Sequence, residues 1–371
     1  MMGDVYKNAV ITIAAAASCD SNTGIFDVLE EKGKYYGALK LHPDSSACES
    51  VQVSTFKGEE IMEDPMFHLP LATRGWALQE RIFSQRVHYG RRGIYWQCRT
   101  AHLSADGNSP RGRAALYIPH GALLKLPQIL TSANRPSQIR KIHDVWLSVV
   151  ESYCSYRRLS FATDKLPAMA GIASTIQELT GGVYLAGIWK EDFMNGLLWQ
   201  TWKDPRRVKH RAPSWSWARW DGYVTFVMSQ YETSDDDLLA QLLQCHIQPS
   251  GDNPFGEVSS GSLHMRGWTT IRTIDKIAQL GGLRLDGYSW TPYMKDIVSS
   301  FGNTEYTVML IGSFSWHTLP EVPPEISKIG MLVLKPVDGE SNTIFERIGI
   351  VTHYGHTFDM TGRTRQELTI I

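Results

Sequence analysis

The spacing of hydrophobic positions changes along the chain and separates three kinds of pattern. Residues 10–15 form a continuous apolar run, which is typical of a strand buried on both faces of a parallel sheet. Between residues 139 and 153, apolar side chains recur every three or four positions and predict one helix of about five turns. Beyond residue 212 the period falls towards two, which is typical of strands. The predicted strands cover residues 223–228, 242–247, 262–268, 306–311, 330–334 and 347–352.

Turn and cap residues place further elements in the first hundred residues. Two apolar runs, residues 86–89 and 94–98, flank a Gly-Arg-Arg-Gly segment and predict a β-hairpin, because glycine readily adopts the positive φ of a tight turn. Thr73 is predicted to cap a short helix that carries Leu78 and Ile82 on one face. These signals put a helix directly before a hairpin.

The middle of the chain contains a connecting region followed by helices. Residues 104–136 are rich in Ser, Asn, Gly and Pro, as connecting segments are. A second helix is predicted to begin near residues 163–164, with Pro167 in its first turn, and to end at the glycines 181 and 182.

A basic run at residues 203–211 is followed closely by tryptophans. Trp215 and Trp217 alternate with serines, which predicts that both indoles lie on one face of a strand and pack in the core. The basic run is then a solvated loop. The alternative is a single-strand nucleic-acid site, in which cations contact phosphates and rings stack on bases. Its candidate contacts are Arg206, Arg207, Trp202 and Trp220.

Composition narrows the class of protein. The chain has 371 residues, 43% of them hydrophobic and 20% charged, which indicates two or three globular domains. A net charge of −1 gives no support for nucleic acid or an anionic membrane as a partner of the whole protein. The five cysteines form no C-x-x-C pair, so we expect reduced thiols, a cytoplasmic location and no metal site. The longest apolar stretch, residues 9–17, is too short to span a bilayer.

Glu80 is the one carboxylate that we single out as a candidate acid or base. It follows Trp76 by one helical turn, so the two side chains share a face and the carboxyl group could lie in an apolar cleft. The alternative is that Glu80 pairs with Arg81, Arg74 or a nearby backbone group. The chain carries no dinucleotide, phosphate-loop, zinc-protease or hydrolase motif.

Several segments, in this order and spacing, resemble the fungal heterokaryon-incompatibility (HET) domain. They cover residues 1 to about 220. The segments are residues 4–9 (DVYKNA), 12–15 (TIAA), 21–26 (SNTGIF), 73–81 (TRGWALQER), 95–98 (YWQC), 164–173 (DKLPAMAGIA), 184–192 (YLAGIWKED) and 211–218 (RAPSWSWA).

The resemblance implies a mixed α+β or α/β fold class and a division of the chain. Residues 1–103 are expected to be part of a Toll/interleukin-receptor-like α/β HET domain, residues 104–210 a linker and helical region, and residues 211–371 a β-rich C-terminal domain. The family's earlier strands are expected before Asp4, so the domain is expected to be truncated at its amino end. A domain of this type without its first strands would have an uncovered sheet edge.

The resemblance also implies a function. The family acts in vegetative nonself recognition and programmed cell death, so other incompatibility proteins and self-association are the expected partners, and nucleic acid is not. Within the matching block, Arg74, Trp76 and Gln79 are candidate interaction residues beside Glu80. Toll/interleukin-receptor-like domains include enzymes that cleave NAD, so NAD is the candidate substrate if the chain is an enzyme. No bound cofactor is expected, and catalysis would require the strands that precede Asp4 in the family.

Overall fold

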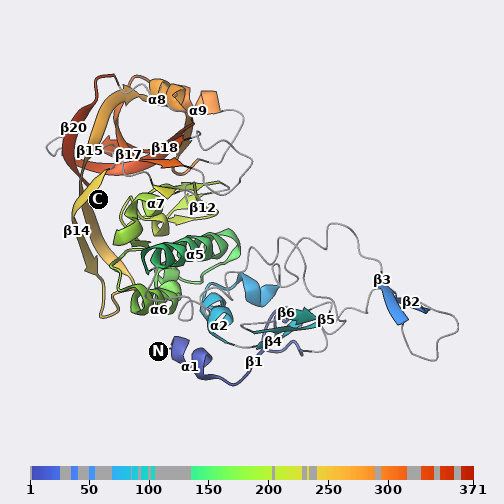
Figure 1. The fold of residues 1–371 in the computed structure, drawn as a ribbon. Coiled ribbons are helices and arrows are strands. Elements are labelled where there is room, and N and C mark those ends of the chain that lie inside the picture. Colours follow the sequence, from blue (N-terminus) through green and yellow to red (C-terminus); the bar gives the residue numbers. More distant parts are fainter. Residues whose placement is uncertain are drawn as a thin grey trace. The chain divides into compact units, whose positions relative to one another are not determined.

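The computed structural model divides the chain into two compact units (Figure 1). Unit 1 comprises residues 1–128 and 156–158, and unit 2 comprises residues 129–155 and 159–371. The residues that the structure describes are 2–25, 35–40, 50–54, 69–84, 86–90, 93–98, 102–104, 135–202, 205–227, 232–233, 240–288, 294–315, 327–337, 343–354 and 361–371.

Unit 1 is built on a small mixed sheet with the strand order β1-β4-β5-β6. β1 runs parallel to β4, and the other neighbours are antiparallel. Two helices, α1 and α2, and a 3-10 turn, η2, belong to the same unit, and β2 and β3 form a separate antiparallel pair. The bounds are α1 Met2–Asn8, β1 Thr12–Ala14, β2 Tyr35–Lys40, β3 Ser50–Ser54, η2 Pro70–Thr73, α2 Ala77–Phe83, β4 Arg86–Gly90, β5 Gly93–Gln97 and β6 His102–Ser104.

The predicted hairpin and short helix are present in unit 1. β4 and β5 pair in the expected antiparallel register, and Leu78 and Ile82 are buried on one face of α2. The predicted cap is wrong, however, because the Thr73 hydroxyl donates to the Pro70 carbonyl at 2.8 Å and closes the 3-10 turn. α2 begins four residues later, at Ala77.

The apolar run at residues 10–15 forms only the three-residue strand β1. Val10 and Ile13 are 91% and 61% exposed, whereas Ala14 is buried. The prediction of burial on both faces is therefore wrong. Successive side chains of a strand point to opposite faces, and Ala14 is buried while its neighbour Ile13 is exposed, so only one face of β1 is covered.

The helices of unit 2 include the two that the sequence predicts. α5 buries Ile142, Trp146 and Val149 on one face, as its periodicity predicts. α6 ends at Gly181, whose positive φ of 74° is typical of a helix C-terminus, but it begins later than predicted because two 3-10 turns precede it. The bounds are α5 Arg135–Tyr156, η4 Ala162–Lys165, η5 Pro167–Met169, α6 Ala170–Thr180, η6 Lys190–Asp192, α7 Phe193–Leu197, α8 Ile274–Leu280 and α9 Met294–Ser300.

The C-terminal part of unit 2 contains an eight-stranded sheet. Five of the six predicted strands belong to this sheet, and the sixth, at residues 223–228, is present as Val224–Phe226 in a separate two-stranded pair. β15 pairs with both β17 and β20, so the strands β15-β17-β18-β19-β20 close into a ring (Figure 1). Ile274 and Ile277 of α8 belong to the same core cluster as Val308 and Met331 of the ring. The bounds are β13 Glu232–Thr233, β14 Gln241–Pro249, β15 Val258–Thr273, β16 Gly282–Leu285, β17 Glu305–Ser315, β18 Ser327–Pro336, β19 Ile344–Tyr354 and β20 Thr364–Ile370.

The mixed content of helices and strands confirms the α+β class in its general sense. Residues 159–210 fall in the same compact unit as the strands that follow them. The finer division, with boundaries after residues 103 and 210, stays a prediction. Among the helices that the structure describes, none is long and apolar enough to cross a membrane.

Tryptophans fill the core of unit 2 beside the ring, with Trp146, Trp189, Trp199, Trp215 and Trp217 fully buried. The predicted burial of Trp215 and Trp217 is confirmed, but the predicted strand is wrong. Residues 214–216 form a turn, and Trp217 opens the 3-10 helix η7 (Trp217–Arg219) because the Ser216 hydroxyl accepts from the Ala218 amide.

Short antiparallel strand pairs also belong to unit 2, and two of their strands carry the core residues Trp189 and Trp199. The strands are β7 Tyr184–Leu185, β8 Ile188–Trp189, β9 Trp199–Thr201, β10 Arg206–Arg207, β11 Trp220–Asp221 and β12 Val224–Phe226.

Candidate functional site

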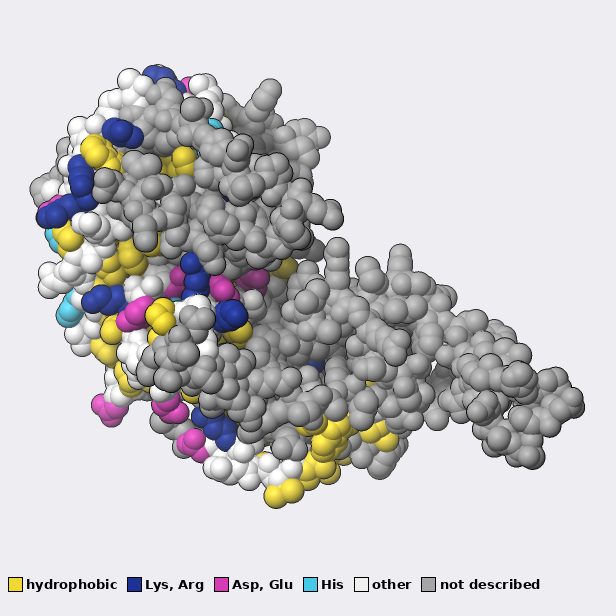
Figure 2. Space-filling model, in the orientation of Figure 1, with side chains coloured by type: hydrophobic (Ala, Val, Ile, Leu, Met, Phe, Trp, Pro, Cys, Tyr) yellow, Lys and Arg dark blue, Asp and Glu magenta, His cyan; other side chains and the backbone are white. Residues whose placement is uncertain are grey.

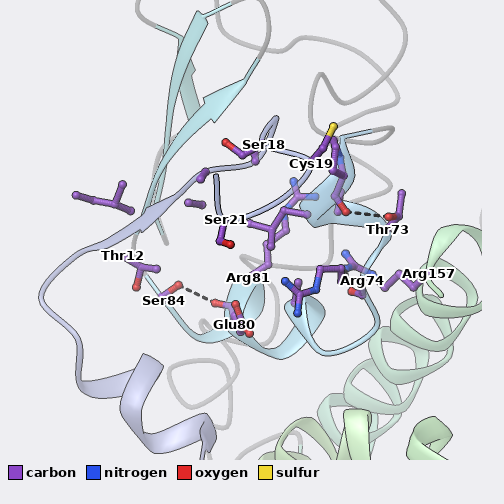
Figure 3. Close-up of a pocket in the computed structure, with 18 of the residues that line it drawn as sticks. Thr12, Ser18, Cys19, Ser21, Thr73, Arg74, Glu80, Arg81, Ser84 and Arg157 are labelled. Atoms are coloured by element: carbon purple, nitrogen blue, oxygen red, sulfur yellow. Dashed lines mark hydrogen bonds between the residues drawn. The ribbon is translucent and has the colours of Figure 1, made fainter. Parts of the chain in front are cut away.

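A pocket of about 640 Å³ lies in unit 1 and holds the main sequence candidate, Glu80. Its walls come from four places in the chain: the end of α1, β1 with the turn that follows, the segment from η2 to α2, and Arg157 (Figure 3). Most of the wall is formed by small side chains and hydroxyls, into which a few charged groups project. The charged side chains are Asp20, Arg74, Glu80, Arg81 and Arg157.

Helical spacing explains why α2 supplies the pocket floor. Ala77, Glu80, Arg81 and Ser84 all line the pocket, and they follow one another at three-, one- and three-residue steps, which is one face of a helix. The opposite face carries the buried residues Leu78 and Ile82. Burial of that apolar face therefore fixes the direction of the Glu80 and Arg81 side chains.

Tyr6 of α1 is the partner of Glu80 that the sequence does not reveal. Burial raises the pKa of the Tyr6 phenol, and the charge of Glu80 and a hydrogen bond to it raise that pKa further. Tyr6 also lines the pocket. A neutral phenol thus donates to the Glu80 carboxylate, and the pairing of Glu80 with Arg74, Arg81 or a nearby backbone group stays a prediction.

Three arginines surround the same space. Arg157 donates to the Arg74 carbonyl at 3.1 Å, and two backbone hydrogen bonds join residues 73–75 to Arg158. The Asp20 carboxylate accepts from the Asn22 amide and from the amide and hydroxyl of Thr23, each at 2.9 Å, which lowers the pKa of Asp20. Asp20 is thus engaged in its own turn. The pocket carries more positive than negative charge and suits an anionic ligand with hydroxyl groups.

The other candidates in this block lie outside the pocket wall. Trp76 is half-buried, and Gln79 is 3% exposed on the buried side of α2. Neither side chain lines the pocket.

The candidate residues near the basic run lie in unit 2, and their side chains are engaged with other residues of the same chain. Arg206 forms an ion pair with Asp221 at 3.0 Å, and Arg207 forms one with Glu346 at 3.5 Å. Trp220 is buried, and the Trp202 indole donates to the Thr225 hydroxyl at 2.6 Å. These pairs reduce the charge that the run offers to phosphates. The run is also not wholly a solvated loop, because Arg211 at its end is buried.

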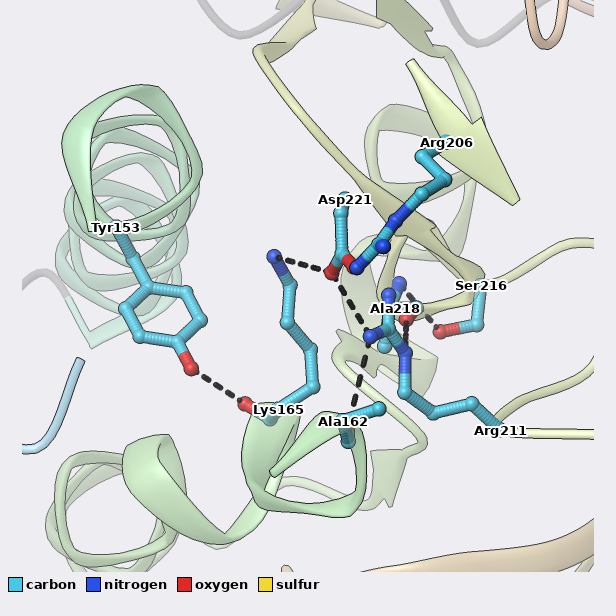
Figure 4. A network of polar contacts seen from close by, with 8 residues as sticks. All are labelled: Tyr153, Ala162, Lys165, Arg206, Arg211, Ser216, Ala218 and Asp221. Carbon is cyan, nitrogen blue, oxygen red and sulfur yellow. Dashed lines mark hydrogen bonds and ion pairs between the residues drawn. The ribbon is translucent and has the colours of Figure 1, made fainter. Parts of the chain in front are cut away.

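Asp221 is the centre of a partly buried cationic cluster that sequence reasoning missed (Figure 4). Its carboxylate lies 2.8 Å from Arg211, 3.0 Å from Arg206 and 4.0 Å from Lys165. The Lys165 ammonium group also lies 5.1 Å from the centre of the Tyr153 ring. One carboxylate thus faces three cations, two of them buried, and holds together segments that are distant in the sequence.

Two further carboxylates in unit 2 have raised pKa values. Burial raises the pKa of Asp192 to about 7, and the charge of Asp144 adds to the effect, although a hydrogen bond from Asn195 opposes it. Burial raises the pKa of Asp144 to about 6. They belong to α5 and η6, and nothing in the local sequence around either residue indicates that they interact. Neither lines the pocket of unit 1.

Within the part of the chain that the structure describes, no group of three or more His, Cys, Asp or Glu side chains could hold a metal ion. Comparison of the chain with protein-family models, curated proteins and solved structures finds no match.

Proposed function

We propose that the chain is a cytoplasmic protein of the heterokaryon-incompatibility type, which acts as an interaction or effector module in nonself recognition and programmed cell death. The observation that carries this proposal is the convergence of HET-like segments on one pocket. Residues 12–15, Ser21 and the arginine-bearing block at 73–81 are separate in the sequence, yet all contribute to its wall. Segments that resemble one family and also build one cavity support a shared role better than scattered matches would.

Three further HET-like segments, residues 164–173, 184–192 and 211–218, support the proposal as a scaffold in unit 2. The Ser216 hydroxyl donates to the Ala186 carbonyl at 2.6 Å, and the Trp217 indole donates to the Gly187 carbonyl at 2.8 Å. These bonds join the segments at residues 184–192 and 211–218. Lys165 of the segment 164–173 shares Asp221 with Arg211.

Expression in a filamentous fungus tests the proposal. Induction of the chain should arrest growth and kill cells, and Arg74→Ala with Glu80→Gln should reduce the effect by about tenfold or more if the pocket carries it. Lys209→Ala, which changes an exposed cation of unit 2, is the matched control and should behave as the wild type. Immunoblot verifies that the variants and the wild type are expressed at equal levels. Normal growth on induction of the expressed chain would overturn the proposal.

Cleavage of NAD is a second candidate function, favoured by the placement of Glu80. A carboxylate that accepts from Tyr6 and lies among Arg74, Arg81 and Arg157 has the groups needed to bind a diphosphate and to stabilise a developing positive charge on a sugar. Purified full chain should then release nicotinamide from NAD, measured by chromatography. We expect Glu80→Gln to reduce this activity by at least about 100-fold. Glu257→Gln, at an exposed site of unit 2, is the control and should retain the activity. Absence of nicotinamide release would reject catalysis by this chain and leave the signalling proposal intact.

A further inference from the structure

A polar network crosses strands β15 and β20 on one face of the eight-stranded sheet of unit 2. The register places His264 opposite Thr369 and Arg266 opposite Glu367. Because successive side chains of a strand alternate between faces, residues two positions apart share a face, so all four side chains lie together. Figure 2 shows basic and histidine side chains on the side of unit 2 where Figure 1 places these strands.

The network joins a hydroxyl, an imidazole and a carboxylate in series. Thr369 Oγ1 lies 3.2 Å from His264 Nδ1, and the other ring nitrogen, Nε2, lies 3.3 Å from Glu367 Oε2. Arg266 donates from Nε to Glu367 Oε1 at 2.9 Å and forms an ion pair with the same carboxylate. Hydrogen bonds from Arg266 and His264 hold the pKa of Glu367 below its ordinary value, so this group is ionised at neutral pH.

The ionised Glu367 determines the tautomer of His264. A carboxylate only accepts, so the proton of the neutral ring lies on Nε2 and the lone pair of Nδ1 faces the Thr369 hydroxyl. A hydroxyl beside a base that a third group orients is the arrangement that activates a nucleophile. The side chains of His264 and Glu367 are 37% and 44% exposed, and Thr369 is half-buried, so a substrate can reach the network.

A cavity of about 460 Å³ adjoins the network and indicates the charge of its ligand. Arg266 and Glu367 belong to its wall, and Arg365, Gln241 and Gln366 complete it. Two guanidinium groups and one carboxylate give the wall a net positive charge. Positive charge stabilises the negative oxygen that forms when a hydroxyl attacks an ester, and it also suits an anionic group elsewhere on the substrate.

We propose that Thr369 and His264, positioned by Glu367, hydrolyse carboxylic esters that carry an anionic group. Thr369 Oγ1 attacks the carbonyl carbon while its proton passes to His264 Nδ1. The bond from this carbon to the alcohol oxygen then breaks, and His264 gives the proton to the leaving alcohol. Water repeats both proton transfers on the acyl-threonine, which releases the acid and restores the hydroxyl. This site lies in unit 2 and does not depend on the pocket of unit 1.

Release of p-nitrophenol from p-nitrophenyl hemisuccinate and p-nitrophenyl acetate by the purified full chain tests the site. The anionic ester should react faster, and Thr369→Val and His264→Ala should each reduce kcat/KM by about 100-fold or more. Thr369→Ser keeps a hydroxyl and should retain most of the activity. His246→Ala, which removes an exposed histidine of the neighbouring strand β14, is the matched control and should behave as the wild type. Equal rates for His264→Ala and His246→Ala would overturn the proposal.

The acyl intermediate identifies the nucleophile independently. Mass spectrometry of the chain, quenched with acid during turnover of the hemisuccinate ester, should locate the succinyl group on Thr369. Glu367→Gln should lower kcat by about tenfold or more with little change in KM, because Glu367 acts through His264. Urea titration verifies that each variant is folded. A succinyl group found only on other residues, or an effect of Glu367→Gln on KM alone, would reject these roles.

Discussion

Replacing Asp221 with asparagine is expected to lower the free energy of unfolding by about 2–4 kcal/mol. The substitution keeps the shape of the side chain but removes the negative charge that pairs with Lys165, Arg206 and Arg211. Arg211 and Lys165 are buried, so their charges would remain in a low-dielectric region without the carboxylate that they share. Urea titration followed by tryptophan fluorescence measures the change, because five fully buried tryptophans lie in unit 2.

The pH dependence distinguishes this electrostatic cause from a packing defect. Burial alone would raise the pKa of Asp221, but Arg211, Arg206 and Lys165 outweigh it and hold the pKa below its ordinary value. A carboxylate with a lowered pKa stabilises the fold above the pKa of the unfolded chain, and this contribution is lost as the pH falls through the folded-state pKa. The stabilities of wild type and Asp221→Asn should therefore converge on acidification from neutral pH. Asp252→Asn, at an exposed site, should match the wild type at every pH.

Periodic elements could be predicted because their signal is local. The spacing of Ile142, Trp146 and Val149 is sufficient to define one face of α5. The alternation of serine with Trp215 and Trp217 misleads, because a side-chain hydrogen bond from one residue can replace a strand with a turn. The sequence does not predict β20, because only two of its seven residues, Leu368 and Ile370, are buried. The strand therefore lacks a regular alternation of apolar and polar side chains.

The candidate site could be predicted only as far as a single helix extends. Glu80 and Arg74 are recognisable because they share one block of sequence around α2, and both line the pocket. Tyr6 and Arg157 come from distant segments that tertiary contacts bring to the same wall, and no local pattern in the sequence indicates this. The availability of the basic run for phosphates is overestimated from the sequence for the same reason, because the partners of Arg206 and Arg207 come from distant positions. These partners are Asp221 and Glu346.

The core of unit 2 should tolerate no side chain at Gly187. This glycine has a φ of +105°, which L-residues rarely adopt, and a Cβ atom there would lie 2.6 Å from the Trp217 Nε1 atom. The Gly187 carbonyl also accepts from the Trp146 and Trp217 indoles at 3.0 and 2.8 Å, so the backbone cannot move without loosening two buried hydrogen bonds. We expect Gly187→Ala to lower the free energy of unfolding by about 2–5 kcal/mol, the sum of backbone strain and overpacking.

A matched glycine separates these two costs. Gly302 has a φ of +58°, within the left-handed α region, and open space where a Cβ atom would lie. Gly302→Ala should therefore cost about 1–2 kcal/mol of backbone strain, which is a lower bound for the strain at Gly187, whose φ of +105° lies outside that region. The excess at Gly187 is assigned to the indole by a double-mutant cycle with Trp217→Phe, because phenylalanine lacks the Nε1 atom that the new methyl group meets. Gly187→Ala should therefore cost less in the Trp217→Phe background than in the wild type. An equal cost in both backgrounds would show that the strain lies in the backbone and that Trp217 does not press against Gly187.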